Sequence, residues 1–102
     1  YEFLTPMGSS QESCPKMVVI YTQLDPGTWS NDEWLSHSAE ECIFALKGSV
    51  DVFAGDIKYS LDEGDSLYIR ENTPHKIYNP GAEKAISISS MTPAVFISNL
   101  RS

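Results

Sequence analysis

The sequence predicts an all-β protein, a small antiparallel sandwich or barrel, and three observations support this fold class. Apolar runs of about five to eight residues, rich in Val, Ile, Tyr and Phe, recur along the chain. Gly, Pro, Asn and Asp separate these runs, as expected of turns between strands. No segment shows a sustained helical period, and the one short helical turn that we expect covers residues 31–34.

The expected strands follow one another along most of the chain, with turn signals between them. Pro26-Gly27 ends the first strand, Gly55-Asp56 predicts a hairpin, and Glu63-Gly64 marks a further turn. The polar stretch at residues 7–16 is expected to be a surface loop. The strands are predicted at residues 16–24, 41–47, 49–54, 57–61, 65–70, 75–79, 84–91 and 94–98.

Length, composition and charge exclude several classes of protein. The chain has 102 residues, enough for one compact domain, and its 41% hydrophobic content is too high for intrinsic disorder. Seven Lys and Arg against fourteen Asp and Glu give a net charge of -7, so this segment is not expected to contact nucleic acid directly. No apolar run approaches the roughly 20 residues that span a bilayer. Two cysteines do not indicate a fold that is held together by disulfides, as small secreted domains are. This cysteine usage favours a cytoplasmic location.

Both histidines of the chain stand where an expected strand begins. Glu41 follows His37 by four residues, and Asn79 follows His75 by four. Residues four apart share one face of a strand, although the same spacing also fits one face of a helix. The apolar runs beside these residues favour the strand.

Two interpretations of these polar residues remain open at this point. A histidine at a strand edge is most often a solvated or hydrogen-bonded structural residue, and a glutamate is usually solvated. Two imidazoles and a carboxylate that converge, however, form a facial set that binds Zn, Fe, Mn or Ni and leaves coordination positions open. The spacing alone does not establish convergence.

Residues 35–79, and more loosely 24–96, resemble a cupin, specifically a small single-cupin domain. In "HSAEECIFALKG", His37 stands at the second histidine of the first cupin motif, Glu41 at its glutamate and Gly48 at its closing glycine. The resemblance implies a double-stranded β-helix, or jelly-roll barrel, with residues 1–102 forming one cupin domain.

The second cupin motif follows after a gap of fifteen residues, in "GDSLYIRENTPHKIYN". Gly64 stands at its first glycine, His75 at its histidine and Asn79 at its asparagine. Arg70 replaces the motif's proline, and Asn72 replaces its second glycine.

One ligand position of the family is altered, because Leu35 stands where the first histidine is expected. The resemblance therefore implies a three-ligand set of His37, Glu41 and His75 for a divalent transition metal, Zn, Fe, Mn or Ni. Three protein ligands with water at the remaining position are a common arrangement.

The segments "YEFLTP", "HSAEE…ALKGSVDV", "TPHKIYNPG" and "MTPAVF" together resemble the C-terminal cupin sensor domain of bacterial regulators with an XRE-type helix-turn-helix. The resemblance implies a homodimer and a C-terminal fragment of a longer chain, in which a missing N-terminal domain contacts DNA. The start at Tyr1 rather than Met led to the same expectation.

The function expected from this resemblance is the sensing of a small organic effector inside the barrel. If side chains alternate along the strands from His37 onward, one set of them points towards the interior of the barrel. We predict that this set binds the effector. The set is His37, Glu41, Ile43, Ala45, His75, Ile77 and Asn79.

The alternatives are a metal-dependent cupin enzyme, a dioxygenase or isomerase that uses His37, Glu41 and His75, and a purely structural domain. No other residue stands out as a catalytic acid, base or nucleophile. Cys42 is predicted to be a small buried hydrophobe. Trp29 and Trp34 precede His37 and are expected either to pack over the barrel mouth or to form a lid over the ligand.

Overall fold

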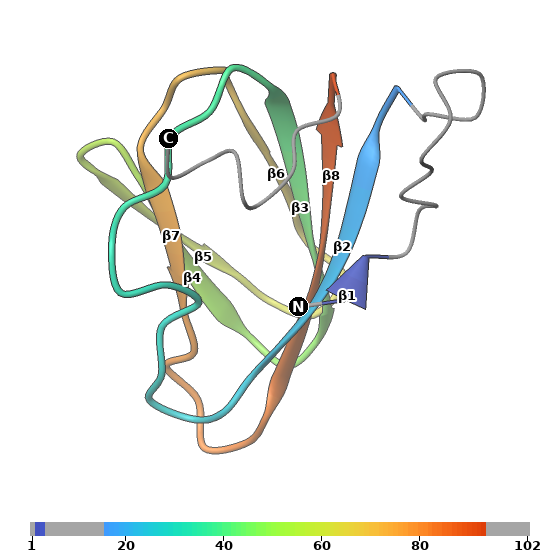
Figure 1. Ribbon diagram of the computed structural model, residues 1–102. Helices are drawn as coiled ribbons and strands as arrows, with labels where there is room; N and C mark the ends of the chain where they lie inside the picture. Colours follow the sequence, from blue (N-terminus) through green and yellow to red (C-terminus); the bar gives the residue numbers. More distant parts are fainter. Residues whose placement is uncertain (1, 4–15, 94–102) are drawn as a thin grey trace.

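The computed structural model describes residues 2–3 and 16–93 of the chain, and this part is built from strands alone (Figure 1). No helix occurs in it, and so none long and apolar enough to cross a membrane. The strands are β1 (Glu2–Phe3), β2 (Val18–Leu24), β3 (Glu40–Lys47), β4 (Val50–Ala54), β5 (Ile57–Leu61), β6 (Ser66–Ile69), β7 (His75–Tyr78) and β8 (Ala85–Thr92).

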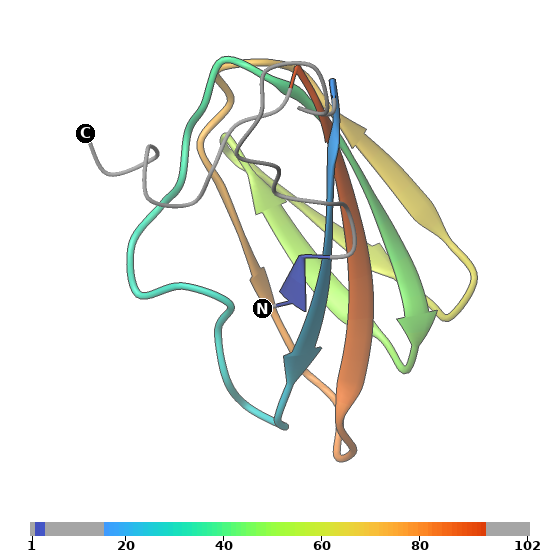
Figure 2. The ribbon, with the colours of Figure 1, turned by 45° about the vertical axis from the view of Figure 1, so that its right-hand side comes forward.

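Two antiparallel sheets face each other and form a small barrel. One sheet has the strand order β1-β2-β8-β3-β6, and the other has the order β5-β4-β7. The two sheets meet at one end of the molecule and spread apart at the other, as Figures 1 and 2 show. The predicted fold class, a small antiparallel β-barrel, is confirmed.

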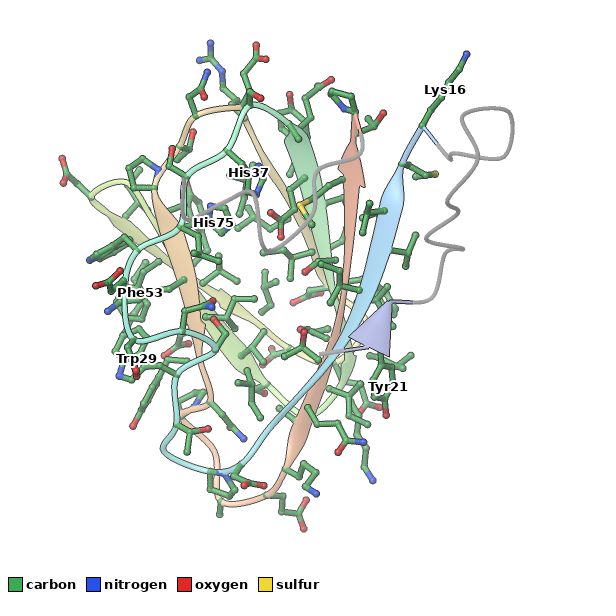
Figure 3. The ribbon with its side chains drawn as sticks, viewed as in Figure 1. Lys16, Tyr21, Trp29, His37, Phe53 and His75 are labelled. Carbon is green, nitrogen blue, oxygen red and sulfur yellow. The ribbon has the colours of Figure 1, made fainter. Side chains whose placement is uncertain are left out.

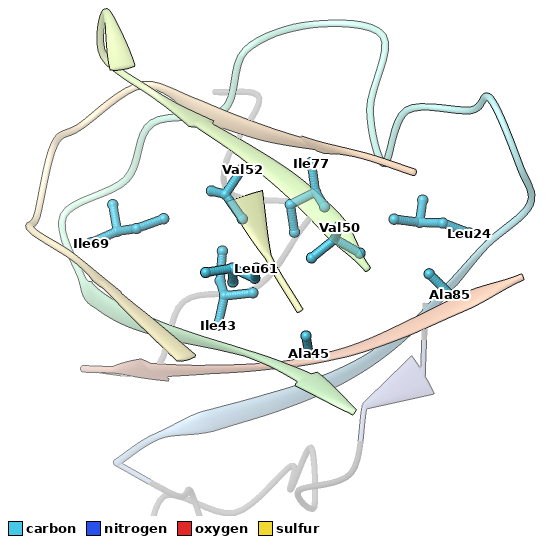
Figure 4. Packing of buried hydrophobic residues seen from close by; sticks show 9 residues of the cluster. All are labelled: Leu24, Ile43, Ala45, Val50, Val52, Leu61, Ile69, Ile77 and Ala85. Atoms are coloured by element: carbon cyan, nitrogen blue, oxygen red, sulfur yellow. The ribbon is translucent and has the colours of Figure 1, made fainter. Parts of the chain in front are cut away.

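The apolar core lies between the two sheets because the strands turn alternate side chains inward (Figure 4). In β3 the buried residues are Glu41, Ile43 and Ala45, whereas their immediate neighbours are exposed. Ile43 faces Val50 and Val52 of β4 across the core. Burying such a side chain contributes roughly 1.5–3 kcal/mol, so these contacts hold the sheets together.

The hairpin predicted at Gly55-Asp56 is confirmed. Ala54 and Ile57 pair as the last residues of β4 and β5, which leaves the two-residue turn between them. Gly55 has a φ of 60°, in the left-handed region that such a tight turn requires.

The helical turn predicted at residues 31–34 is wrong, because the chain from Gly27 to Leu35 runs beside β7 instead. The amide of Ser30 donates to the carbonyl of Ile77 at 2.7 Å. Leu35 and His75 exchange both backbone hydrogen bonds, at 3.0 and 2.8 Å. A single helical turn fixes several residues for one hydrogen bond, so pairing with an open strand edge satisfies more backbone groups.

Two other predictions lie outside the described residues. These are the strand at 94–98 and, except for Lys16, the surface loop at 7–16.

Candidate functional site

Three polar side chains meet inside the barrel at the end where the sheets spread apart. His37 lies in the segment before β3, Glu41 is the second residue of β3, and His75 is the first residue of β7. Figure 3 shows His37 and His75 close together between the two sheets. Their exposed fractions are 8% for His37, 5% for Glu41 and 4% for His75, so all three are buried. The triad, as these residues are called below, brings together the predicted metal ligands.

The geometry of the triad centres on one carboxylate oxygen. The Oε1 atom of Glu41 lies 3.0 Å from the Nε2 atom of His37 and 3.0 Å from the Nε2 atom of His75. The two imidazole rings meet edge to face, with centroids 5.2 Å apart. One donor atom from each residue can therefore bind a common ion, since these atoms lie within 4.8 Å of one another.

Backbone contacts hold His75 in place. Its Nδ1 atom donates to the carbonyl of Thr73 at 2.9 Å, and its amide and carbonyl pair with Leu35. A carbonyl oxygen can only accept, so the Nδ1 atom carries a proton and the Nε2 atom faces Glu41. Local structure thus fixes both the orientation and the tautomer of this histidine.

The turn before His75 shows how the chain accommodates Asn72 where the second cupin motif has a glycine. Asn72, in the position of the motif's glycine, has a φ of 60°. Asn adopts this left-handed conformation more readily than other residues with a side chain. The amide of Asn72 donates to the carbonyl of His37 at 2.7 Å, so this turn also positions the first histidine.

Burial and charge act in opposite directions on the triad. Burial raises the pKa of Glu41, but hydrogen bonds from His37 and His75 and the charges of these rings lower the pKa from 4.5 to about 2. Burial lowers the pKa of His75, but the hydrogen bond to Glu41, its charge and the bond to Thr73 raise the pKa above 6.5. The balance favours an imidazolium beside a carboxylate.

The triad also meets the requirements of a divalent transition metal. Two imidazole nitrogens and a carboxylate oxygen are the donors that Zn, Fe, Mn or Ni accept, and the three lie close enough to share one ion. The bond from His75 to Thr73 resembles the outer hydrogen bond by which metal-binding histidines are oriented. The Nδ1 atom of His37 is buried and has no partner among the described residues.

A cavity of about 30 Å³ adjoins the triad, which is room for one or two water molecules. Thr22 of β2 and Ser89 of β8 place hydroxyl groups on its wall, and neither has a hydrogen-bond partner in the described part of the chain. The hydroxyl of Ser87, on the same face of β8 as Ser89, is fully buried and also has no partner among the described residues. The residues that line the cavity are Ile20, Thr22, Ser30, Asn31, Leu35, His37, Glu41, His75, Ile77, Ser89 and Met91.

Several of these lining residues were missed by sequence reasoning, although two of them left a signal. Thr22 and Ser89 are polar residues at inward positions of their strands, where apolar neighbours such as Ile20 and Met91 lead one to expect apolar side chains. Ser30 and Asn31 left no such signal, because they reach the cavity from an irregular segment.

The remaining predicted ligand-binding residues occupy different places. Ile77 lines the cavity, whereas Ile43 and Ala45 lie in the apolar core. Asn79 is 1% exposed, and its amide donates to the carbonyls of Leu24 and Glu83 at 2.9 and 2.8 Å. Asn79 therefore joins the end of β7 to the end of β2 and to the turn before β8. A role of Ile43, Ala45 and Asn79 in ligand binding stays a prediction.

Trp29 packs on the outside of the three-stranded sheet. Its ring lies 4.8 Å from that of Tyr78 and 5.2 Å from that of Phe53, measured between centroids. The ammonium group of Lys76 lies 4.4 Å from the ring of Trp29 and 5.1 Å from that of Trp34. Neither tryptophan is among the residues that line the cavity.

The prediction that Cys42 is buried is wrong, because its side chain is exposed. Glu41 and Ile43 point inward on β3, so alternation turns the residue between them to the outer face.

The fold and the triad define a class of protein, the small antiparallel β-barrel with a facial set of two imidazoles and a carboxylate at one end. Comparison with known families agrees with this class, since residues 20–91 match the cupin domain. The chain therefore belongs to the cupin family.

Solved structures share the fold at low sequence identity. A cupin 2 conserved barrel domain protein from Salinispora arenicola has a TM-score of 0.74 and 17% identity, over 98% of this chain and 80% of that one. A sugar phosphate isomerase from Silicibacter pomeroyi has a TM-score of 0.69 and 15% identity, over 81% of this chain and 54% of that one. Among curated proteins, UDP-glucose 6-dehydrogenase from Caenorhabditis elegans is 33% identical over 75 residues. That match covers 67% of this chain but spans only 15% of the dehydrogenase.

Proposed function

We propose that this chain is the ligand-sensing cupin domain of a bacterial transcriptional regulator and binds a small organic effector at the triad. The observation that carries the proposal is the cavity beside Glu41, which combines a charged end, apolar walls and unpaired hydroxyl groups. Binding sites for small molecules have this composition, an apolar surface with a few convergent polar groups. The motifs shared with regulator sensor domains support the regulatory part.

The size and chemistry of the cavity restrict the effector. About 30 Å³ admits a polar head group of two or three heavy atoms, so the remainder of the effector lies toward the mouth. The hydroxyls of Thr22 and Ser89 both donate and accept hydrogen bonds. Glu41 accepts only, and the chain carries a net charge of -7. A neutral or cationic head group with hydroxyl or amine donors therefore suits the metal-free site better than a bare anion.

Regulation requires that the effector bind one arrangement of the regulator more tightly than another. His75 and Leu35 join the segment before β3 to β7, so a group that binds His75 acts on both sheets. This domain supplies the effector site, and a separate segment supplies the contacts with DNA.

A metal-dependent enzyme is the second candidate, and a specific observation favours it. The three donor atoms of His37, Glu41 and His75 lie within 4.8 Å of one another, and all three residues line the same cavity. A divalent metal bound there would supply redox chemistry for a dioxygenase, or Lewis-acid chemistry for an isomerase. His37, Glu41 and His75 would hold the ion, and the apolar side chains of Leu35 and Ile77 line the cavity beside it.

Elemental analysis by plasma mass spectrometry separates the two candidates. It is applied to the untagged chain, to His37→Ala and His75→Ala, and to the surface control Lys58→Ala. Near-stoichiometric metal that disappears in both histidine variants but not in the control supports the metal-dependent site. Metal-free protein in all four samples, all of them folded, contradicts it.

A thermal-shift screen of small polar metabolites then tests effector binding. A ligand at a hundred times its Kd stabilises the fold by about 2.7 kcal/mol. Loss of this shift in Thr22→Val and Ser89→Ala would place the ligand in the cavity. Sequencing the parent gene tests the regulatory part, which fails if no helix-turn-helix lies upstream.

A further inference from the structure

The segment between β2 and β3, teal in Figure 1, runs along the free edge of β7 and has an inner and an outer side. Its inner side lines the cavity beside the triad through Ser30, Asn31 and Leu35. Its outer side carries Trp29 and Trp34, which are 41% and 47% exposed and do not line the cavity. This segment therefore separates the cavity from solvent along β7.

Backbone bonds join this segment to β7 at two places and leave a bulge between them. The amide of Ser30 donates to the carbonyl of Ile77, and Leu35 exchanges both backbone bonds with His75. Four residues lie between Ser30 and Leu35, whereas a single residue of β7 lies between their partners. Within the described part of the chain, residues 31–34 make no backbone hydrogen bond to other main-chain groups. We call residues 31–34 the gate.

The residue of β7 opposite the gate is Lys76, and its side chain connects the two ends of the bulge from outside. Its ammonium group lies 4.4 Å from the ring centroid of Trp29 and 5.1 Å from that of Trp34. An ammonium ion at these distances is attracted to the face of an indole ring. Trp29 also packs against Phe53 and Tyr78, so this end is anchored to the three-stranded sheet. We call the contact of Lys76 with the two indole rings the clasp.

The gate is the part of the cavity wall that opens at the lowest cost. Outside the segment between β2 and β3, every residue that lines the cavity belongs to a strand. Moving a strand breaks the backbone bonds of a sheet, whereas the gate has no such bonds to break. Three of its four side chains, those of Asp32, Glu33 and Trp34, are exposed. Segments with few buried contacts open locally at a fraction of the free energy of global unfolding.

We propose that a ligand enters and leaves the cavity through the gate, and that the clasp determines how often the gate opens. This inference rests on the proposed function only in that the cavity takes a ligand. Because the clasp lies outside the cavity, its loss loosens the gate in the free and in the bound protein alike. A change that does not distinguish two states leaves the equilibrium between them unchanged. Loss of the clasp should therefore speed binding and release by the same factor.

A thiol placed inside the cavity measures the opening of the gate without any ligand. The chain carries Cys14→Ser and Cys42→Ser, which remove its own thiols, and Ser89→Cys in the cavity wall. The rate of its labelling by methyl methanethiosulfonate is compared with that of Ala45→Cys, a fully buried core position that the reagent reaches by global unfolding. We expect the cavity thiol to react faster. Its rate should also depend less on urea, because a local opening exposes little surface.

Variants of two lysines then test the clasp. Lys76→Gln should speed the labelling of Ser89→Cys by about fivefold to thirtyfold, the equivalent of two exposed cation–π contacts. Lys76→Arg keeps a cation over the indole rings and should restore slow labelling. The matched control is Lys58→Gln, which removes the same charge from the strand on the other side of Phe53 and should have no effect.

A loss of global stability must be separated from a loss of the clasp. Val50→Ala weakens the core between the sheets but does not contact the gate, so it should speed the labelling of Ala45→Cys and leave that of Ser89→Cys unchanged. Circular dichroism confirms that each variant is folded.

Three results would overturn the proposal. Equal labelling rates for Ser89→Cys and Ala45→Cys would show that the cavity opens by global unfolding alone. An unchanged rate in Lys76→Gln, or an equal rise in Val50→Ala, would show that the clasp does not control the gate. A failure of the proposed function would be visible separately, as a lack of binding in the metal analysis and the thermal-shift screen, because the labelling rates require no ligand.

Discussion

The Nε2 atom of His75 faces the Oε1 atom of Glu41 at 3.0 Å, while the Nδ1 atom on the other side of the ring donates to the carbonyl of Thr73. With one proton fixed on the Nδ1 atom, the space between Nε2 and Oε1 has to hold a second positive charge. In the metal-free protein below the raised pKa of His75 this charge is a proton, which makes His75 an imidazolium. A metal ion at the triad takes the place of that proton.

This arrangement makes the stability of the metal-free protein depend on pH in both directions. The lowered pKa of Glu41 adds stability that is complete above pH 4.5 and is lost as the pH falls toward 2. The raised pKa of His75 adds stability that is complete below pH 6.5 and is lost as the pH rises through that higher value. The pair should therefore stabilise the fold most between pH 4.5 and 6.5, which thermal unfolding in the presence of a chelator can measure.

Glu41→Gln should flatten this pH dependence, because it removes the carboxylate that titrates and the charge that raises the pKa of His75. At pH 6 we expect a loss of about 3 kcal/mol in the free energy of unfolding, the equivalent of the pKa shift of Glu41. Urea unfolding at pH 3, 6 and 9 provides the comparison. An unchanged profile in the variant would assign the pH dependence to other groups.

Leu35→His should strengthen metal binding. The side chain of Leu35 lines the cavity beside the triad, and its backbone is paired with His75, so an imidazole there can reach a bound ion. A fourth nitrogen donor is expected to raise the affinity for Zn by about tenfold or more, measured by competition with a chromogenic chelator. Leu35→Asn, similar in size but a weak ligand, is the control, and equal affinities in both variants would contradict the prediction.

Asn72→Gly should leave the stability and the triad unchanged, whereas Asn72→Val should destabilise the fold by about 1–2 kcal/mol. The cause is the φ of 60°, which glycine adopts freely and a β-branched residue avoids. Chemical unfolding of both variants measures the difference. Equal stabilities would show that this turn does not need the left-handed conformation.

Asn79→Ala should lower the stability without abolishing metal binding. The variant removes the bonds to the carbonyls of Leu24 and Glu83 and from the amide of Gly81. The bond to Leu24 is buried, so its loss alone costs about 1–3 kcal/mol. Unfolding and metal titration on the same sample separate this effect from a role in the site. A stable variant that has lost binding would instead support Asn79 as a ligand-binding residue.

The strands and the buried face of each could be predicted because alternation is local, as in β3, where Glu41 and Ile43 point inward. The convergence of Glu41 with His75 could not be predicted from the sequence, because it depends on which sheet each strand joins. Residues 31–34 were misassigned for a related reason, since the edge of β7 that they accompany lies far along the chain. Cys42 was misassigned because it stands in a continuous apolar run, residues 42–46, in which the sequence does not distinguish inward from outward positions.

The triad joins parts of the chain that β4, β5 and β6 separate, so its side chains meet only when the barrel closes. Contacts between such distant segments form late in folding, because the intervening loop must be ordered first. An ion or effector that binds the triad is then absent from the folding transition state. We expect it to slow unfolding and to leave the rate of folding almost unchanged. The bound state would therefore be distinguished chiefly by its lifetime.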